Sequence, residues 1–247
     1  MAELVLKGVR LLISGFDMSG KHNSLTINHT ADILDRTCFN SSARKRLAGL
    51  TDMDMSLEGY WGSTNVDKQS FDNIGSSGRV VTVVPTTTDG QTAFMGRGCY
   101  SGYIPGGTVG ELLGFSVSIV GSETPSLVRG KLLCGRQTTG VGSSSGASIS
   151  FGVPTSTQKL YATFHLCQPP TTDLSGGKVG GEIVGSCSSG FTVGATTMIS
   201  IALTSATTGQ WATTTSTGTS TSKSFYRFAY RTTGTPNLQW FVCAGYR

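Results

Sequence analysis

The sequence predicts an all-β fold: a β-sandwich or barrel with one short flanking helix, followed by a second β-sandwich-like domain. Composition points to it first, because only 13% of the residues are charged while glycine occurs 34 times among abundant serine and threonine. Such a composition disfavours long helices. Apolar residues also recur at every other position in several short segments, as they do in half-buried strands. Turn-forming residues separate these segments at the spacing of a sandwich or barrel.

The most informative strand covers residues 51–61, where apolar and acidic side chains alternate. Its apolar face holds Met53, Met55 and Leu57, and its acidic face holds Asp52, Asp54 and Glu58. Side chains in a strand point alternately to its two faces. This segment is therefore predicted to be a half-buried strand whose outer face is negative.

Short apolar runs bounded by glycine, proline or polar clusters predict the other strands. In the first half of the chain they cover residues 4–14, 24–28, 79–84, 92–95, 99–104 and 112–120. In the second half they cover residues 147–151, 159–167, 179–186, 198–204, 225–232 and 238–245. Together they predict two β-rich regions.

One helix is predicted, over residues 65–74. Thr64 is a suitable N-cap, Asp67 lies in the first turn, where the helix dipole favours a carboxylate, and Gly75 is a suitable end. The apolar positions form a thin stripe of Val66, Phe71 and Ile74.

Glycine and serine content sets the predicted domain boundaries. Residues 1–125 are expected to form the first β domain, residues 126–146 a Gly/Ser-rich linker, and residues 147–247 the second β-rich domain. Within the linker, residues 140–146 are flexible by composition. Residues 213–222 are of low complexity and fit either an exposed loop or a threonine-rich edge strand.

Charge is distributed unevenly along the chain. Residues 1–125 hold 10 basic and 12 acidic side chains, a net charge of −2, and residues 126–247 hold 9 and 2, a net charge of +7. The basic residues of the second half are scattered, which favours a solvated surface over a nucleic-acid site. No run of about 18 apolar residues predicts a membrane span, and no secretory leader pattern opens the sequence.

Residue types that carry catalysis or metal binding are sparse. The six cysteines are widely spaced with no CxxC pair, so they are expected to be buried and free rather than zinc ligands or disulfides. His22, His29 and His165 are expected at a surface or strand edge. The GSSSG segment at 142–146 matches the nucleophile-elbow pattern but lacks its strand-to-helix context. No enzyme activity, cofactor or metal is predicted.

The basic triplet Arg44, Lys45 and Arg46 lies in a polar segment, residues 41–50. A nucleic-acid site is one interpretation, but no aromatic side chains are interleaved with the charges. A solvated loop, or a loop that pairs with an acidic neighbouring subunit, fits the segment better.

The segment from Leu25 to Trp61 resembles the N-terminal region of siphophage tail tube (major tail) proteins. The resemblance rests on the polar, basic loop, on the Ala48-Gly49-Leu50 turn followed by Asp52, and on the alternating strand that ends in SLEGYW at 56–61. Residues 96–122 look like the later part of the same domain, and the second half is similar to the C-terminal region of longer members. Two departures are the extra cysteines and the Gly/Ser-rich segment 174–193.

The resemblance implies a structural virion protein without enzymatic activity. Copies would share strands in a continuous barrel, and rings would stack into the tube that conducts DNA during ejection.

In such a tube, Asp52, Asp54 and Glu58 are expected to face the lumen, and Arg44, Lys45 and Arg46 to contact the next ring. The ring would be a hexamer, or a trimer with pseudo-sixfold symmetry if both halves carry the tube fold. The expected partners are further copies, other tail proteins and DNA in transit, with no membrane. The expected location is the virion tail, after assembly in the host cytoplasm.

The main alternative is a virion decoration or receptor-binding β-sandwich module. Tyr226, Phe228 and Tyr230 share one face of a predicted strand and would form an exposed aromatic patch in such a module. Packing in a core explains the same pattern equally well. A hydrolase is a distant third interpretation, because no nucleophile–base set is visible.

Overall fold

The computed structural model describes residues 8–62, 66–139, 142–155, 157–168, 179–192, 194–202, 208–214, 223–232 and 238–247. Within these residues the chain is mostly β-strand, with one short helix, α1 (Val66–Asp72), which confirms the all-β prediction. No helix in this described part has the length and apolar character needed to cross a membrane.

The strands follow the predicted segments closely in several places. Residues 79–84, 179–186 and 225–232 form strands at the predicted bounds. In the first half of the chain the strands are β1 (Arg10–Ile13), β2 (Phe16–Asp17), β3 (His22–Asp35), β4 (Arg46–Tyr60), β5 (Arg79–Val84), β6 (Thr92–Gly106) and β7 (Gly114–Gly121). They continue with β8 (Leu127–Thr139), β9 (Gly142–Ser145), β10 (Ile149–Ser150), β11 (Leu160–Gln168), β12 (Val179–Ser186), β13 (Thr196–Ala202), β14 (Thr208–Thr213), β15 (Phe225–Thr232) and β16 (Leu238–Tyr246).

The chain divides into two compact units. The sandwich unit comprises Met1–Gly20, Arg79–Gly96 and Val128–Arg247, and the hairpin unit comprises Lys21–Gly78 and Arg97–Leu127. These units differ from the predicted division at residue 125, and β8 and β9 occupy most of the predicted linker 126–146. That residues 1–125 and 147–247 fold as separate domains stays a prediction.

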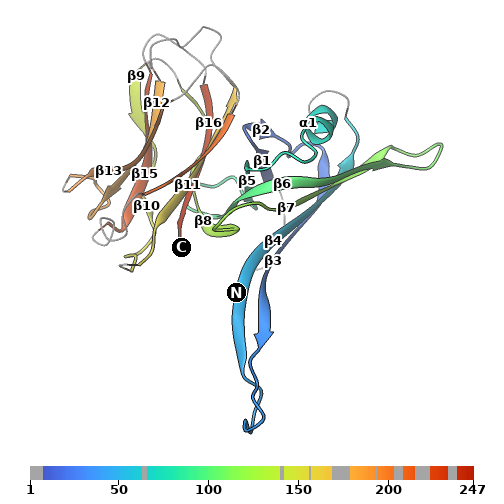
Figure 1. Cartoon of the computed structure of the whole chain (residues 1–247). Coiled ribbons are helices and arrows are strands. Elements are labelled where there is room, and N and C mark those ends of the chain that lie inside the picture. The colour runs from blue at the N-terminus through green and yellow to red at the C-terminus, as the bar shows by residue number, and fades with distance from the viewer. Residues whose placement is uncertain are drawn as a thin grey trace. The chain divides into compact units, whose positions relative to one another are not determined.

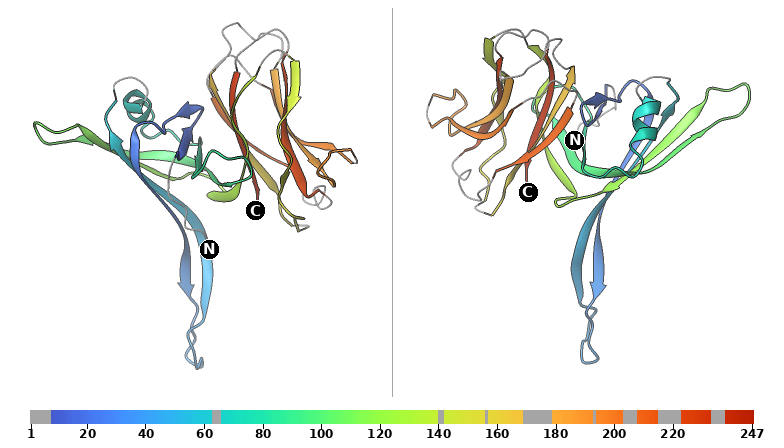
Figure 2. Two further views of the ribbon diagram at one scale, coloured as in Figure 1. Left: turned by 180° about the vertical axis from the view of Figure 1, so that it is seen from behind. Right: turned by 45° about the horizontal axis from the view of Figure 1, so that its top comes forward.

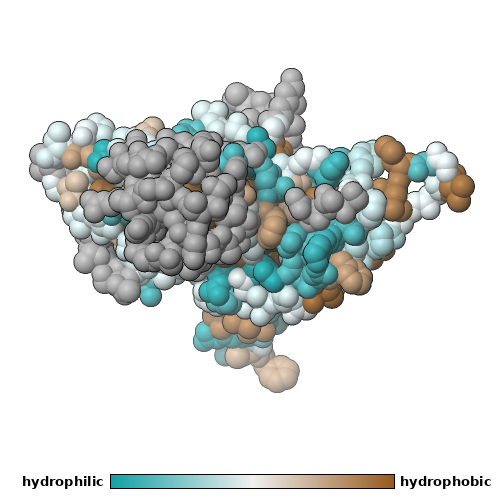
Figure 3. All heavy atoms as spheres, turned by 90° about the horizontal axis from the view of Figure 1, so that it is seen from above, coloured by the Kyte–Doolittle hydropathy of each residue, from teal (hydrophilic) through white to brown (hydrophobic). Residues whose placement is uncertain are grey.

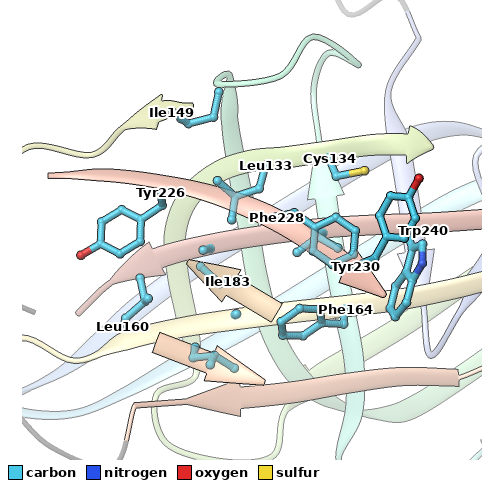
Figure 4. Close-up of a cluster of buried hydrophobic side chains, with 14 of the residues drawn as sticks. Leu133, Cys134, Ile149, Leu160, Phe164, Ile183, Tyr226, Phe228, Tyr230 and Trp240 are labelled. Atoms are coloured by element: carbon cyan, nitrogen blue, oxygen red, sulfur yellow. The ribbon is translucent and has the colours of Figure 1, made fainter. Parts of the chain in front are cut away.

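The sandwich unit packs one antiparallel sheet against another. The first sheet has the order β14-β11-β16-β8-β6-β5-β1-β2, and the second has the order β10-β15-β12-β13, with β9 also paired to β15. Figure 4 shows side chains from both sheets meeting in one apolar core. Trp240 and Phe164 reach this core from the first sheet, while Phe228 and Ile183 reach it from the second.

The aromatic residues of β15 belong to this core. Tyr226 and Phe228 are 0% exposed and Tyr230 is 8% exposed. The rings of Phe228 and Trp240 lie 5.2 Å apart, edge to face, in the geometry that aromatic pairs prefer. The core interpretation of these residues is therefore correct, and they form no exposed aromatic patch.

His165 corrects the prediction of a surface or strand-edge position. It lies on β11, between β14 and β16, and is fully buried. Its Nδ1 accepts a hydrogen bond from the Gly15 N–H at 3.2 Å, so Nε2 carries the proton and donates to Thr82 Oγ1 at 2.8 Å. Thr82 donates in turn to Thr163 at 2.9 Å. This network joins β5 and β11 to the tight turn between β1 and β2, and burial lowers the His165 pKa to about 3.

The hairpin unit contains a four-stranded antiparallel sheet in the order β3-β4-β7-β6, to which β6 contributes its C-terminal half. Strands β3 and β4 form one long hairpin, and β6 and β7 form another; Figures 1 and 2 show each as a two-stranded ribbon toward its end. Predicted strand 24–28 is thus only the centre of β3, which continues to Asp35. Residues 46–50, predicted to be loop, belong to β4.

Helix α1 lies against β6, near the start of both hairpins. The Tyr103 hydroxyl on β6 donates a hydrogen bond to the Asp67 carboxylate in its first turn, and the Gly75 N–H donates to the Tyr100 carbonyl at 2.9 Å. The predicted end at Gly75 is wrong: α1 ends at Asp72, and Gly75, with a positive φ of 78°, lies three residues beyond it. The predicted apolar stripe is wrong in part, because Val66 is buried but Phe71 is 68% exposed. The predicted N-cap, Thr64, lies outside the described residues.

The cysteines fit the prediction in one respect only. All six are free, as expected. Only Cys134 and Cys243 are buried, whereas Cys38 and Cys187 are exposed. The expectation that all six serve as buried apolar residues is therefore wrong for the two exposed thiols.

Candidate functional site

The two faces of the hairpin unit's sheet differ sharply, and β4 shows the difference best. Met53, Met55 and Leu57 are each at most 1% exposed. Asp52, Asp54 and Glu58 are all exposed. The predicted alternation is therefore confirmed, and the sheet has an apolar face and an acidic face.

Uncharged side chains, most of them hydroxyl or amide, flank the three carboxylates on the neighbouring strands. On β3, Thr30, Asn28 and Ser24 are the partners of Asp52, Asp54 and Glu58. On β7, Glu58 pairs with Ser116, and Asp54 pairs with Val120. Directly paired residues of antiparallel strands point to the same face. None of these positions carries a lysine or arginine, so nothing in these rows neutralises the carboxylates.

Local contacts hold the first of these carboxylates in place. Asp52 Oδ1 accepts a hydrogen bond from the Met53 N–H at 2.7 Å. On the neighbouring strand, a Cβ added at Gly121 would come within 2.8 Å of the same oxygen. Glycine at this position therefore leaves room for the Asp52 carboxylate.

Contacts to α1 fix the other side of the sheet. Burial and the hydrogen bond to Asp67 raise the Tyr103 pKa to about 12. Donation from Tyr103 lowers the Asp67 pKa below its usual range. Tyr103 therefore stays a neutral donor to a charged carboxylate under ordinary conditions, which keeps the helix at the apolar face and leaves the acidic face uncovered by it.

The end of the β3–β4 hairpin, residues 31–50, is here named the basic arm. It has no core of its own, because both of its faces are exposed. The exposed apolar side chains are Ile33 (60%), Leu34 (54%), Phe39, Leu47 (51%) and Leu50 (82%). A two-stranded hairpin without a covering layer is at best marginally stable in water. The basic arm is therefore built in a way that favours contact with another surface.

The predicted basic triplet lies on this arm. Arg46 begins β4 opposite Asp35, while Arg44 and Lys45 lie just before it, and all three side chains are exposed. The Arg36 N–H donates to the Lys45 carbonyl at 2.8 Å, and the Lys45 N–H donates to Thr37 Oγ1 at 3.0 Å. The structure thus places the triplet and the three predicted carboxylates on one hairpin, in separate regions.

The end of the β6–β7 hairpin, residues 104–113, is here named the apolar arm. Its exposed side chains include Ile104 (68%), Val109, Leu112 (74%) and Leu113 (44%). Hydrophobic side chains gather near the end of this hairpin in the space-filling view (Figure 3, right). Glu111 is its single charged residue, which makes its charge opposite to that of the basic arm.

Sequence reasoning missed the exposed apolar residues of both arms. In a sequence, Leu47 and Leu50 look like ordinary core residues, because burial is not encoded by residue type alone. Apolar and polar side chains do not alternate regularly over residues 31–50, and this missing alternation is the sequence signal that the stretch lacks a buried face. It distinguishes this stretch from the regular alternation of residues 51–58.

The acidic face carries one open hollow, and the described residues offer no cluster that could bind a metal ion. No group of three or more histidine, cysteine or acidic side chains in the described residues is placed to hold a metal ion. An open hollow of about 370 Å³ lies on the acidic face, between Glu58, Tyr60, Ile104 and Ser116. The hollow is shallow, and Glu58 is the only charged residue that lines it, so it holds no nucleophile–base pair.

No protein-family model matches the sequence, and no curated protein does. A chain from the "virion of native gene transfer agent (GTA) particle" is 18% identical with a TM-score of 0.39, covering 48% of this chain and 95% of that one. The SPP1 Dit protein, described as a hub adsorption apparatus in Gram-positive infecting phages, is 9% identical with a TM-score of 0.38, covering 98% and 100%. The SPP1 tail tube is 12% identical with a TM-score of 0.38, covering 51% and 78%. At TM-scores below 0.5, these likenesses decide neither the family nor the function.

Proposed function

We propose that the chain is a structural, non-enzymatic subunit of a phage tail tube, whose rings stack around a channel that conducts DNA. The observation that carries this proposal is the uncovered face of the hairpin unit, which presents three carboxylates among hydroxyl and amide side chains. Such a surface suits a channel wall along which a polyanion must move.

Electrostatics explains why this face suits a DNA channel. A protein that neutralises phosphates with lysine or arginine releases counterions and binds DNA tightly. Asp52, Asp54 and Glu58 have no basic neighbour in the paired rows of β3 and β7. A lumen lined by this face would repel the phosphates, so that DNA passes without being held.

The edges of the same sheet support assembly by strand addition. Within the described residues β3 pairs only with β4, and the end of β6 projects as part of a two-stranded hairpin. Open edges of this kind are templates for pairing with another chain, and barrel closure removes them. In our proposal, β3 of one copy pairs with β6 of the next, and the ring closes.

Strand number favours six copies over three when each copy contributes only the four-stranded sheet of the hairpin unit. A pseudo-sixfold trimer would need a second sheet of this kind from the sandwich unit of each copy. Four strands spaced about 4.8 Å apart span about 19 Å, so six copies give a barrel about 37 Å in backbone diameter and three give about 18 Å. Strand tilt widens both by roughly a third, and inward side chains remove about 10 Å. A DNA duplex is about 20 Å wide, which fits the larger lumen and not the smaller one. We therefore propose the hexamer.

The two arms fit contacts between rings. Arg44, Lys45 and Arg46 would meet acidic groups of a copy in the next ring, and the exposed leucines of the basic arm would be buried there. Glu111 of the apolar arm is one acid with suitable surroundings. Other tail proteins would contact the ends of the stack, in a virion tail assembled in the host cytoplasm.

Electron microscopy of the purified full chain tests this proposal directly. Tubes or stacked rings are expected, whereas discrete small oligomers would favour the decoration or receptor-binding alternative. That alternative has lost its main support, since Tyr226, Phe228 and Tyr230 are core residues.

A charge-reversed pair, Asp54→Lys with Glu58→Lys, tests the lumen. Tubes of this variant are expected to retain DNA in a filter-binding assay at low salt, and wild-type tubes are not. Glu182→Lys, on β12 of the sandwich unit, is the matched control and should not retain DNA. Equal retention by the variant and the wild type would contradict a lumenal position for these carboxylates.

A further inference from the structure

A buried lysine lies beside an exposed cysteine in the sandwich unit. Cys187 directly follows β12, and Lys223 lies two residues before β15. The Ser224 N–H donates to the Ser186 carbonyl at 3.2 Å, which continues the β12–β15 pairing and brings the two side chains together. Cys187 is exposed, whereas Lys223 is only 9% exposed.

The lysine amine has unusual partners. Nζ donates hydrogen bonds to the Gly194 carbonyl and, at 3.8 Å, to Cys187 Sγ. No described carboxylate lies within ion-pair distance of Lys223. An ammonium that is buried without an opposite charge is costly. Ion pairing within the described residues therefore does not explain why a lysine occupies this position.

The surrounding backbone is fitted to the pair. Gly194 has a φ of +62°, and a Cβ there would lie 3.2 Å from Lys223 Nζ and 3.5 Å from Cys187 Sγ. Three residues earlier, Phe191 has a φ of +55°, a conformation that a bulky side chain rarely adopts. The Arg227 guanidinium lies 4.2 Å from the centre of the Phe191 ring. Strained backbone of this kind is retained mainly where it positions functional groups.

We propose that Cys187 and Lys223 are a redox-controlled cross-linking site, which forms a reversible sulfenamide bond. A hydroperoxide oxidant first converts the Cys187 thiol to a sulfenic acid, and the peroxide is reduced to water. The Lys223 ammonium gives up a proton to water, its nitrogen attacks the sulfur, a nitrogen–sulfur bond forms, and the hydroxyl leaves with a second amine proton as a second water. A dithiol reductant cleaves the bond and regenerates the thiol and the amine.

The exposed Cys187 is suited to the oxidation step, and the buried Lys223 is suited to the attack on the oxidised sulfur. The exposed Cys187 sulfur is open to the oxidant. The shielded amine is held at 3.8 Å and intercepts the sulfenic acid before further oxidation. The bond joins residues 36 positions apart and ties the end of β12 to the segment before β15. A cross-link of this length restricts the unfolded chain, so the oxidised protein is expected to melt at a higher temperature.

The test treats the full chain with hydrogen peroxide at neutral pH and then analyses peptides by mass spectrometry. A linked pair of peptides that contains Cys187 and Lys223 is expected, about 2 Da lighter than the sum of its parts and lost on reduction with dithiothreitol. Cys38 is an internal control, because it is also exposed and its thiol donates to the Arg36 carbonyl rather than contacting an amine.

Two variants complete the experiment. Lys223→Arg keeps a cation at this position, but the guanidinium stays protonated and cannot attack, so Cys187 should proceed to sulfinic acid, as is also expected of Cys38. Cys187→Ser should abolish the linked peptide, and Cys38→Ser should leave it unchanged. If wild-type Cys187 instead gains one or more oxygens of about 16 Da each while Lys223 stays free to be acylated after denaturation, the proposal is wrong.

Discussion

The sandwich unit and the hairpin unit solve the same problem, burial of apolar surface, in opposite ways. In the sandwich unit two sheets bury one another's apolar residues, and Trp240, Phe164 and Phe228 are each at most 1% exposed. In the hairpin unit one short helix lies on the sheet, and the two arms carry Leu50 and Leu112 at 82% and 74% exposure. The sandwich unit therefore buries its apolar surface within the chain, whereas the arms of the hairpin unit leave theirs exposed, as we expect of surfaces that are buried only on assembly.

This difference separates stability from assembly. Substitutions in the sandwich core should lower the free energy of unfolding whether or not the chain assembles. Substitutions in the arms should leave that free energy almost unchanged and act on the assembled state.

Trp240→Ala should lower the free energy of unfolding by about 4 kcal/mol, because it opens a cavity in a core that is otherwise closed. Urea unfolding, monitored by circular dichroism, measures the change. Trp61→Ala, at a 40% exposed position in the hairpin unit, is the matched control and should cost less than about 1 kcal/mol. Equal losses for the two variants would contradict the comparison.

Acid should destabilise the sandwich unit through His165. Its pKa is about 3 in the folded state, below its ordinary value, so the folded state keeps the ring neutral while the unfolded chain takes up a proton. Stability is therefore lost as the pH falls below about 6.5, by about 3 kcal/mol between pH 7 and pH 4.5 for a single proton. Urea unfolding at the two pH values measures it.

His165→Gln is the control for this pH dependence. The amide can still donate to Thr82 but leaves the Gly15 N–H without its acceptor, which costs about 1–3 kcal/mol at pH 7. Because glutamine does not titrate, the gap between this variant and the wild type should narrow as the pH falls. A constant gap would show that His165 does not carry the acid sensitivity.

Leu47→Ser combined with Leu50→Ser should change the free energy of unfolding by less than about 0.5 kcal/mol per site and yet abolish tubes. Both side chains are exposed in the chain, so their burial is gained only on assembly. Electron microscopy shows whether tubes form, and urea unfolding of the same variant measures the free energy of unfolding. Val153→Ser, at a 71% exposed position in the sandwich unit, should alter neither property. A large loss of stability would mean that the arm packs within its own chain.

Charge reversal of the triplet Arg44, Lys45 and Arg46 to glutamate should shorten tubes without preventing ring formation. The charges are exposed and screened by salt, so the effect should be strongest at low ionic strength. Tube lengths measured in micrographs give the readout. Lys159→Glu, an exposed site in the sandwich unit, is the control, and tubes of normal length from the triplet variant would exclude a stacking role.

Much of the strand pattern could be predicted from the sequence, because it depends on local alternation. The faces of residues 51–58 and the bounds of β5, β12 and β15 follow from that pattern alone. Strands β8 and β9 were missed, because glycine and serine in their sequences suggested a linker. Tertiary pairing with β16 and β15 overrides that composition.

The remaining differences concern partners that are distant in sequence. His165 is buried because Gly15 and Thr82, 150 and 83 residues away, supply its hydrogen bonds. Nothing local distinguishes it from a surface histidine. The three carboxylates were identified correctly as one exposed row, whereas the apolar residues of the arms were not recognised as exposed. Exposure depends on what the rest of the chain leaves uncovered.

The most direct test of the account is a cryo-electron microscopy reconstruction of the assembled full chain. We expect a sixfold ring in which β3 of each copy pairs with β6 of its neighbour and Asp52, Asp54 and Glu58 point into the lumen. A reconstruction with these carboxylates on the outer wall, or with each copy's sheet closed on itself, would contradict it.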